Sequence, residues 1–416
     1  MHVAFFNRSF YPDMAATGQL LTELCESLAR DYHCRVSVVA GVPLLPEADG
    51  VAPSRSRGLF FHREVHRGIE IFRAHGTRWS NRSILGRTSN YLTYFMSATV
   101  AGRFLDKPDV VIALTDPPII GLSAHLAARR FGAPLMVSFR DMFPEINRAL
   151  KGVDSALVDR VLHEISCFLV RQSSRVIALG ETMRQKLIEH KAADPSKTVV
   201  IPDWADCRVI RPRPKRNPFS QAHGLTDAFV VMHSGNMGLS QGLEPLIEAA
   251  AHLQAFSDIR FVLIGEGVKK QDLMAQAAQR GLGNVQFLPH QPKAVLPNSF
   301  ATADVFIVSL QCGLAGYIVP SKLYGILAAG RPYVAAVEPA CEVNAITRQY
   351  RCGLSVEPGD ARGLAKAIQT LYQHRSLTQQ LGRNARRAAS AFDRQQHVRA
   401  YYDLLCGDVT TPSMAA

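Results

Sequence analysis

The residues best suited to binding chemistry lie at 227–251, where a glycine-rich turn joins an apolar run to a helix pattern. Residues 229–232 are typical of a buried parallel strand, 233–242 contain three glycines, and 243–251 carry apolar residues at helical spacing. In such a unit the free N–H groups and the dipole of the helix start face whatever lies above the strand end, and phosphate is their usual ligand. G-N-M-G is neither the dinucleotide fingerprint nor a Walker loop, so a tight connection that binds nothing is the alternative.

A second candidate is Lys322, in the segment 320–332 (PSKLYGILAAGRP). The segment predicts a helix with Pro320 and Ser321 beside the lysine in its first turn, and with inward-facing apolar residues at Leu323, Ile326 and Leu327. A cation is unusual at the positive end of a helix. Lys322 is therefore expected to meet a phosphate that shares this helix end.

Charged residues also gather after the predicted strand 134–139, at Arg140, Asp141 and Glu145. Because ligands bind at the carboxyl ends of strands in open α/β sheets, this cluster is a candidate edge of an active site. A plain surface turn is the alternative interpretation.

Both halves of the chain are predicted to open with a strand, helix and strand unit that positions these residues. In the first half, 2–7 is a strand, 19–30 has one apolar helical face, and 35–40 is the next strand. Further strands are predicted at 108–113, 134–139, 174–179, 259–265, 285–288 and 305–310. A chain of 416 residues is too long for one ordinary core and suits two α/β domains. Residues 208–221, rich in proline and charge, are predicted to link the domains, and a basic helix over 377–405 is predicted to close the chain.

The composition narrows the classes of protein. Hydrophobic residues make up 47% of the chain, which excludes wholesale disorder. The eight cysteines form no C-x-x-C pair or metal spacing, so we expect reduced, buried thiols in a cytosolic protein. We expect no signal peptide, because the chain opens on a strand pattern, and no spanning helix, because every window of about 20 residues holds charged or polar groups. The net charge of +12 favours an anionic partner without choosing among nucleic acid, nucleotide and membrane surface.

The segment from Arg55 to Arg87 is strongly basic: eight arginines against two glutamates give it a net charge of +6. Trp79 lies inside it, and a predicted helix that runs to Leu105 follows, with aromatic and apolar residues at Tyr91, Tyr94, Phe95 and Met96. Arginine beside such residues is the composition of a patch on anionic lipid, where each basic group adds about 1 kcal/mol. Peripheral contact of this segment with an anionic membrane is therefore predicted; a solvated loop followed by a core helix is the alternative.

At these residues the sequence resembles retaining glycosyltransferases of the GT-B fold, family 4, in the branch that builds bacterial surface polysaccharides. The resemblance covers nearly the whole chain and rests on the order of strings at 11–19, 116–145, 201–206, 233–250, 265–267, 284–292 and 319–332. It implies an α/β protein with two Rossmann-like, doubly wound domains that face each other across a cleft. The N-terminal domain, residues 1–207, would bind the acceptor, with a C-terminal helix at about 390–416 packing back on it, and residues 208–389 would bind a nucleotide-sugar donor.

The resemblance also implies roles for individual residues. The string RDMFPE looks like the RDLWPE of this branch, which places Arg140 and Asp141 at the edge of the reacting centre and makes Glu145 a further catalytic candidate. Gly18 matches a glycine loop of the acceptor domain that closes over the donor phosphates. The remaining donor-binding residues are implied around the diphosphate, the nucleotide and its base: Gly235, Asn236, Gly238, Gln241, Glu266, Leu288, Pro289, His290, Ser321 and Lys322.

Three departures from the family pattern affect these assignments. Asn236 stands where the phosphate turn usually has Arg, and Ser240 where it usually has Lys. The two signature glutamates, eight positions apart, fall on Tyr317 and Gly325. Lys322 and Arg331 are predicted to lie near the site, where at least one of them can supply the lost positive charge.

These observations predict a metal-independent, retaining hexosyl- or aminohexosyltransferase. It would move a sugar from a nucleotide diphosphate-sugar to a lipid-linked or polysaccharide acceptor in cell-surface polysaccharide biosynthesis, such as exopolysaccharide, O-antigen or capsule. We expect no cofactor and no metal, since a lysine and glycine amides can stabilise the leaving diphosphate and no carboxylate cluster is arranged for Mg²⁺. The family's front-face mechanism lets the donor phosphate take the acceptor proton, so Asp141 can act as a base, position the acceptor hydroxyl or bind the donor sugar.

Three other functions stay open from the sequence. The lost glutamates admit a catalytically impaired, glycosyltransferase-like partner protein, and the architecture also admits a nucleotide-sugar 2-epimerase. A nucleic-acid binder is argued only from charge, and no nucleic-acid partner is predicted. The expected location is the cytoplasm, with peripheral contact at the inner face of the cell membrane.

Overall fold

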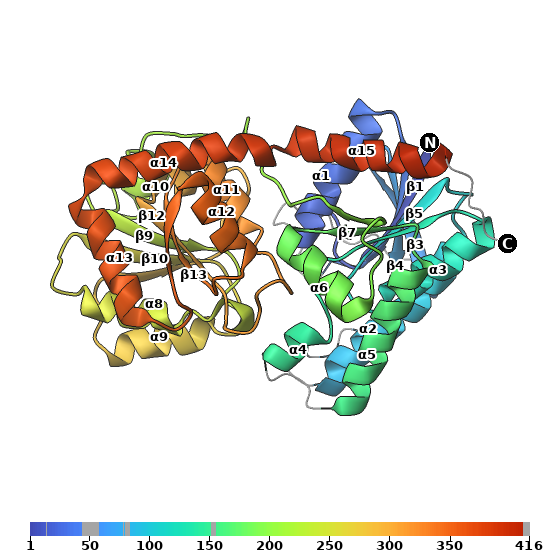
Figure 1. The fold of residues 1–416 in the computed structure, drawn as a ribbon, viewed down its shortest axis with the longest axis horizontal. Helices are drawn as coiled ribbons and strands as arrows, with labels where there is room; N and C mark the ends of the chain where they lie inside the picture. The colour runs from blue at the N-terminus through green and yellow to red at the C-terminus, as the bar shows by residue number, and fades with distance from the viewer. Residues whose placement is uncertain (14, 44–57, 78, 80–83, 151–154, 411–416) are drawn as a thin grey trace. The chain divides into compact units, whose positions relative to one another are not determined.

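The computed structural model describes residues 1–13, 15–43, 58–77, 79, 84–150 and 155–410, which form two compact units (Figure 1). The first unit comprises Met1–Pro202 and His397–Ala416, and the second comprises Asp203–Gln396. In each unit, helices pack against a mostly or wholly parallel sheet, as expected for α/β architecture.

The described residues of the first unit form an eight-stranded sheet in the order β3-β4-β2-β1-β5-β6-β7-β8. All neighbouring pairs are parallel except β3 and β4. The strands are β1 (His2–Phe6), β2 (Arg35–Gly41), β3 (Phe61–His66), β4 (Ile69–Ala74), β5 (Val110–Leu114), β6 (Leu135–Ser138), β7 (Arg175–Ala178) and β8 (Thr198–Val200). Its helices are α1 (Ala16–Asp31), α2 (Ile84–Gly102), α3 (Ile120–Phe131), α4 (Glu145–Ala149), α5 (Ala156–Gln172), α6 (Glu181–Lys191) and most of α15 (Arg394–Thr410).

The described part of the second unit has a six-stranded parallel sheet in the order β11-β10-β9-β12-β13-β14, the strand order of a Rossmann domain. Its strands are β9 (Phe229–Ser234), β10 (Ile259–Ile264), β11 (Val285–Leu288), β12 (Val305–Ser309), β13 (Tyr333–Ala336) and β14 (Gly353–Val356). Its helices are α7 (Pro218–Ala222), α8 (Glu244–His252), α9 (Lys270–Gln279), α10 (Leu296–Thr302), α11 (Lys322–Ala328), α12 (Glu342–Tyr350), α13 (Ala361–Gln373) and α14 (Arg375–Ala389). The apolar faces of α8 and α13 pack with the central strands in one buried cluster that includes Phe229, Ile247, Phe261 and Ile368.

The strand orders define where each sheet can bind a ligand. The chain leaves β1 and β5 toward opposite outer strands of the first sheet, and it leaves β9 and β12 toward opposite outer strands of the second. In open α/β sheets, ligands bind in the crevice beyond the carboxyl ends of such strand pairs. The segments after these four strands therefore position the candidate sites.

The structure corrects the sequence interpretation of the basic segment. Residues 61–74, inside the predicted patch, form the antiparallel hairpin β3–β4. Its two-residue turn has positive φ at Arg67 (48°) and Gly68 (81°), the geometry that follows the twist of paired strands. An arginine at the first of these positions hides the turn, because Asn or Asp usually marks it.

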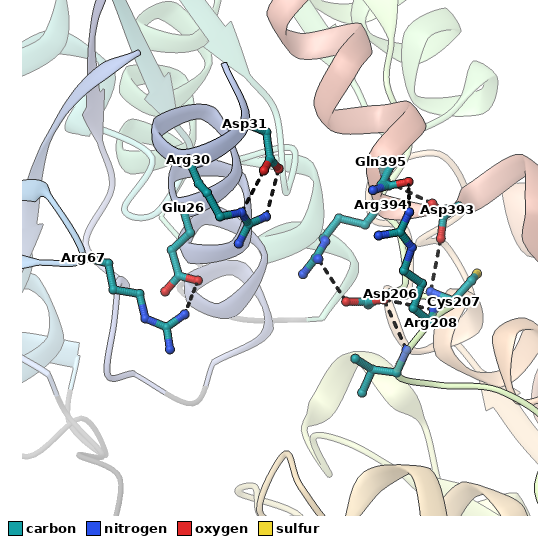
Figure 2. Close-up of polar contacts among 11 residues, drawn as sticks. Glu26, Arg30, Asp31, Arg67, Asp206, Cys207, Arg208, Asp393, Arg394 and Gln395 are labelled. Atoms are coloured by element: carbon teal, nitrogen blue, oxygen red, sulfur yellow. Dashed lines mark hydrogen bonds and ion pairs between the residues drawn. The ribbon is translucent and has the colours of Figure 1, made fainter. Parts of the chain in front are cut away.

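The predicted helix over 377–405 is also wrong as a single element. α14 ends at Ala389, a short 3₁₀ turn covers Ser390–Phe392, and α15 starts at Arg394. Figure 2 shows how polar contacts hold this break: the Asp393 carboxylate accepts hydrogen bonds from the backbone N–H groups of Cys207 and Gln395, both at 3.2 Å. Arg394 pairs with Asp206 at 3.0 Å. The predicted linker, 208–221, lies within the second unit and includes α7.

The cysteines do not all match the predicted buried thiols. None of the eight, all of which lie in the described residues, forms a disulfide; five are buried, Cys207 and Cys406 are half-buried, and Cys312 is exposed. Across the described ranges, every helix falls short of the length and apolar character needed to cross a membrane.

Candidate functional site

The glycine turn after β9 stacks directly on the loop after β10. The backbone N–H of Gly235 donates to the carbonyl of Ile264 at 2.9 Å, and that of Met237 donates to the carbonyl of Glu266 at 2.8 Å. A Cβ on Gly265 would lie 2.0 Å from the carbonyl oxygen of Gly235, at a φ of 142° that L side chains rarely adopt. Only glycine fits this close approach of two backbones.

Gln241 holds the turn from within. Its Oε1 accepts from the backbone N–H of Gly238 at 2.9 Å, and its Nε2 donates to Oγ of Ser240 at 2.9 Å. The Gly238 amide therefore already has an acceptor, and Gln241 supports the turn. Asn236 is exposed and lies beside Gly238, as the missing Cβ of that glycine would approach its Nδ2 at 2.7 Å.

Lys322 lies against the same turn. Its Nζ is 3.2 Å from Nε2 of His233 and 3.3 Å from the position of a Cβ on Gly235. Burial lowers the pKa of Lys322 to about 7. Burial, and then the neighbouring Lys322, hold the pKa of His233 well below its usual value, so the ring is neutral at pH 7.

Lys322 has no counter-charge within the described part of the chain. Its polar contact is the neutral ring of His233, and its pKa has burial as its cause, with no carboxylate contribution. A cation placed against a glycine turn and lacking an acidic partner is suited to an anionic ligand. The helix begins at Lys322, two residues later than predicted, with Ser321 half-buried before it.

The remaining residues predicted for the nucleotide lie at the ends of the neighbouring strands. Glu266 follows β10, is exposed, and accepts from Nζ of Lys270 at 2.7 Å. Leu288 ends β11, and its carbonyl accepts from the Gly265 N–H at 3.1 Å, while Pro289 and His290 are exposed beyond it. The fold thus brings the turn after β9, the loops after β10 and β11, and Lys322 together at the carboxyl ends of the strands. In the described ranges, no group of three or more His, Cys, Asp or Glu side chains is placed to hold a metal ion.

Arg331 does not lie at the carboxyl ends of the strands, contrary to the prediction. It precedes β13, at the amino end of the strands, and its Nη2 donates to the carbonyls of Arg213 at 3.1 Å and Ala301 at 2.5 Å. Gly325, at the position of one signature glutamate, packs against a ring: a Cβ there would lie 2.8 Å from Cε2 of Phe300. Of the two residues predicted to replace the lost positive charge of the phosphate turn, Lys322 is therefore the one that lies beside the turn.

In the first unit, Arg140 and Asp141 follow β6 in a fixed turn. Oγ1 of Thr115, which follows β5, accepts from the backbone N–H groups of Arg140 at 2.9 Å and of Asp141 at 3.3 Å. Arg140 is buried and Asp141 is half-buried. Thr115 was missed from the sequence, although its position one residue after a strand end, before Asp-Pro, is a detectable signal.

Glu145 is held by a buried lysine. Its Oε1 accepts from Nζ of Lys191 at 2.8 Å, and the Lys191 side chain is 0% exposed. The same Nζ donates to the carbonyl of Phe143 at 3.1 Å and lies 3.1 Å from Nδ1 of His163. Through Lys191, this network ties Glu145 to the backbone of Phe143 in the loop after β6.

An ion pair that the sequence analysis missed spans β1 and β5. Nε of Arg8 lies 3.3 Å from Oδ1 of Asp116, whose Oδ2 accepts from Oγ of Ser9 at 2.9 Å. Gly18 lies in the first turn of α1 rather than in the loop where it was predicted. A Cβ on Gly18 would come within 3.3 Å of Ser9 and Phe10, so its bare backbone lets α1 approach this loop.

Three arginines of the predicted Arg55 to Arg87 patch have described side chains. Arg73 is buried and pairs with Glu64, which removes it from the surface. Arg63 pairs with Glu70 and Arg67 with Glu26, while their side chains stay 52% and 68% exposed. The other five arginines, Arg55, Arg57, Arg78, Arg82 and the side chain of Arg87, lie outside the described residues.

Two family profiles match the chain. The profile described as "Glycosyl transferases group 1" matches residues 215–388, and the profile described as "Glycosyl transferase 4-like domain" matches residues 16–204. Together they span most of both units.

Two curated relatives are bacterial. The chain is 28% identical to "Probable glycosyltransferase WbjE" of Pseudomonas aeruginosa over 263 residues, which are 62% of this chain and 65% of that protein. It is 23% identical to "Putative colanic acid biosynthesis glycosyl transferase WcaI" of Escherichia coli (strain K12) over 377 residues, 88% of this chain and 91% of that protein. The match to the first relative thus spans just under two thirds of its length.

Solved structures share the whole fold. The crystal structure of Anabaena Alr3699/HepE in complex with UDP-glucose has a TM-score of 0.72 at 20% identity and covers 98% of this chain and 100% of its own. WaaG, a glycosyltransferase involved in lipopolysaccharide biosynthesis, has a TM-score of 0.70 at 15% identity, with coverage of 97% and 100%. The predicted fold class is confirmed. From the two profiles and this fold, the chain belongs to the GT-B glycosyltransferases of group 1, family 4.

Proposed function

We propose that this glycosyltransferase moves a sugar, with retention and without a metal, from a nucleotide diphosphate-sugar to a lipid-linked or polysaccharide acceptor in cell-surface polysaccharide biosynthesis. The observation that carries the proposal is Lys322, which lies against the Gly235 turn with a neutral histidine as its polar contact. The diphosphate of the donor is the anion that this arrangement would take.

The chemistry follows from that placement. The bond between the sugar carbon and the diphosphate oxygen breaks, a bond to the acceptor oxygen forms, and the acceptor proton passes to the departing diphosphate. Negative charge grows on the diphosphate as the bond breaks, and an ammonium group in a partly desolvated site stabilises that charge more than it would in water. The anion in turn raises the pKa of Lys322 above about 7, so the lysine is fully charged when donor is bound.

The first unit is proposed to bind the acceptor. Asp141 and Arg140 stand in the turn that Thr115 fixes, where they would orient the acceptor hydroxyl. Glu145 and Lys191 would keep that turn in place. Asp141→Asn separates the possible roles, because loss of a base changes the pH profile of kcat, whereas loss of a binding group raises KM.

The names of the relatives suggest which substrates to test first. HepE was crystallised with UDP-glucose, WcaI is named for colanic acid biosynthesis, and WaaG for lipopolysaccharide biosynthesis. UDP-sugars and lipid-linked acceptors are therefore the first candidates. Peripheral contact with an anionic membrane is proposed through the basic segment and the exposed apolar residues beside it, Trp79, Leu92 and Met96.

The experiment is transfer of radiolabel from a panel of UDP- and GDP-sugars to acceptors in membrane extracts. We expect transfer from at least one donor and its loss in Lys322→Ala. Lys366→Ala, which removes an exposed lysine of α13, is the matched control and should transfer normally. The proposal fails if no donor is used and Lys322→Ala binds nucleotides as the wild type does.

A catalytically impaired partner protein is the second candidate, because Gly325 packs against Phe300 where the family has a glutamate. It predicts either no binding of nucleotide in calorimetry or binding without transfer. Product formed from UDP-N-acetylglucosamine alone would instead indicate an epimerase.

A further inference from the structure

A second basic site lies at the amino ends of the strands in the second unit. A pocket of about 910 Å³ opens between α14 and the turn that precedes β13. It is lined by Gly330 and Pro332 before β13 and by Asp304 before β12, so it lies at the amino ends of these strands. The glycine turn and Lys322 lie at the carboxyl ends, so the pocket is separate from the proposed donor site.

Two glycines build the pocket. Gly330 has a φ of 65°, and its carbonyl oxygen lies 2.7 Å from the position of a Cβ on Gly382, so α14 packs closely on the turn after α11 (Figure 1). This contact places one face of α14 beside Arg331. The lining then includes five arginines: Arg331, Arg375, Arg383, Arg386 and Arg387.

None of the five guanidinium groups bonds to a carboxylate in the described structure. Arg331 and Arg386 donate to backbone carbonyls, the latter to Ala328 at 2.9 Å, and Nε of Arg331 is buried without an acceptor. Arg387 donates to Oδ1 of Asn384 at 2.7 Å, and Arg375 lies over the Phe229 ring at 4.4 Å.

The one acidic residue among those lining the pocket, Asp304, offsets only part of this charge. Asp304 pairs with Lys215 and accepts from the backbone N–H of Val230 at 2.7 Å. The pocket therefore gathers five arginines around one carboxylate, and that carboxylate is already paired with Lys215, so positive charge remains in excess. Burial also lowers the pKa of Arg331, which shows that its charge is held against a desolvation cost.

We propose that this pocket binds a phosphate-bearing anion with at least two negative charges. Arginine presents a planar fork of donors that matches phosphate oxygens, and Arg375, Arg383 and Arg387 have donor groups open for this role. Arg331 and Arg386 fix the pocket floor through the carbonyls of neighbouring loops. The anion is a soluble polyphosphate or the headgroup of an anionic lipid; the two share the chemistry and differ in source.

The test compares two double variants with the same change of charge. Arg383→Gln/Arg387→Gln removes two of the three exposed arginines of the pocket, and the side-chain hydrogen bond lost with them is that of Arg387 to Asn384. Arg348→Gln/Arg362→Gln removes two exposed arginines of the same unit, on α12 and α13, that do not line the pocket. Thermal unfolding checks that both variants are folded.

Two probes distinguish the sources of the anion. Titration of inorganic pyrophosphate by calorimetry, in the presence of saturating UDP to occupy the proposed donor site, should show binding by the wild type and the control. We expect at least a tenfold weaker affinity in Arg383→Gln/Arg387→Gln. Sedimentation with phosphatidylglycerol vesicles, against phosphatidylcholine vesicles, is the second arm: if the same variant loses vesicle binding and pyrophosphate competes, the ligand is a lipid headgroup.

Retained vesicle binding together with lost pyrophosphate binding identifies a soluble anion. The proposal is overturned if the pocket variant and the control give the same isotherm, or if the wild type binds neither probe. Sugar transfer by Arg383→Gln/Arg387→Gln is expected to match the wild type with a soluble acceptor, so failure of this proposal leaves the proposed function standing, and the reverse holds for Lys322→Ala.

Discussion

Lys191 and Lys322 are both withdrawn from solvent, and their surroundings differ. The Lys191 side chain, in the first unit, is 0% exposed and bonds to the carboxylate of Glu145 at 2.8 Å. Lys322, in the second, is half-buried, and its Nζ lies 3.2 Å from the neutral ring of His233. Lys191 has its opposite charge within the chain. Lys322 has no carboxylate partner among the described residues, which is why we assign a structural role to Lys191 and a ligand-binding role to Lys322.

The largest expected effect in this comparison is on stability at Lys191. Lys191→Met leaves the Glu145 carboxylate buried without its partner, and breaking a buried pair in this way costs about 3–5 kcal/mol. Urea unfolding should therefore show a much lower midpoint. Lys191→Met/Glu145→Leu, which removes both charges, should recover a large part of the loss; a double variant as unstable as the single one would contradict the buried pair as the cause.

The next effect is on activity at Lys322. Lys322→Met removes the ammonium from the leaving diphosphate, and loss of one such stabilising group typically lowers kcat by about 10²–10³-fold. Stability should not fall, because no buried carboxylate is left behind. Transfer assays and urea unfolding on the same preparations check both parts, and unfolding as severe as that of Lys191→Met would end the distinction between the two lysines.

The sequence predicted Lys322 and missed Lys191 for a physical reason. Lys322 stands between Ser321 and an apolar run at a predicted helix start, where a cation is unexpected. Lys191 ends the helix α6, where a lysine is ordinary, and its burial arises from contacts with residues 46 and 48 positions away along the chain. His233 was missed as well, although a histidine at the end of the apolar run Phe229–Met232 signals a polar group in a core position.

The fold could be predicted from the sequence more fully than the site, for similar reasons. Hydrophobic periodicity and turn residues are local features, so several strands with buried apolar runs, such as Ile259–Ile264, were predicted within a residue or two, although β13 (Tyr333–Ala336) was missed. The hairpin β3–β4 was missed because its outward residues are charged, and β14 (Gly353–Val356) because it is short and only half-buried. The position of Arg331 at the wrong end of the sheet could not be read locally, since it depends on where α11 ends.

The pH dependence expected from Lys322 sharpens the comparison. Burial lowers the pKa of Lys322 to about 7 from its ordinary 10.5, so between these values the unfolded chain binds more protons and stability rises with pH. Lys322→Met should flatten that rise. Donor binding should take up a proton near pH 8, and its affinity should weaken as pH rises above about 7.

Calorimetry of UDP binding at pH 8, in buffers with different ionisation enthalpies, measures this uptake. Lys322→Arg keeps its charge throughout and should bind UDP without proton uptake. Equal heats in all buffers for the wild type would show that Lys322 is already protonated, and the assignment of its low pKa would be wrong.

The smallest expected effect concerns the histidine beside each lysine. His163→Leu removes one contact to Lys191, 3.1 Å from Nζ, and leaves Glu145 in place, so it should cost only about 0.5–1.5 kcal/mol, the net value of one hydrogen bond. UDP affinity should not change. His233→Leu, by contrast, removes the polar contact of Lys322 beside the glycine turn and should weaken UDP binding. If His163→Leu were as damaging as Lys191→Met, the Lys191 network would depend on the ring rather than the carboxylate, and the pairing of opposite charges would no longer explain why Lys191 tolerates burial.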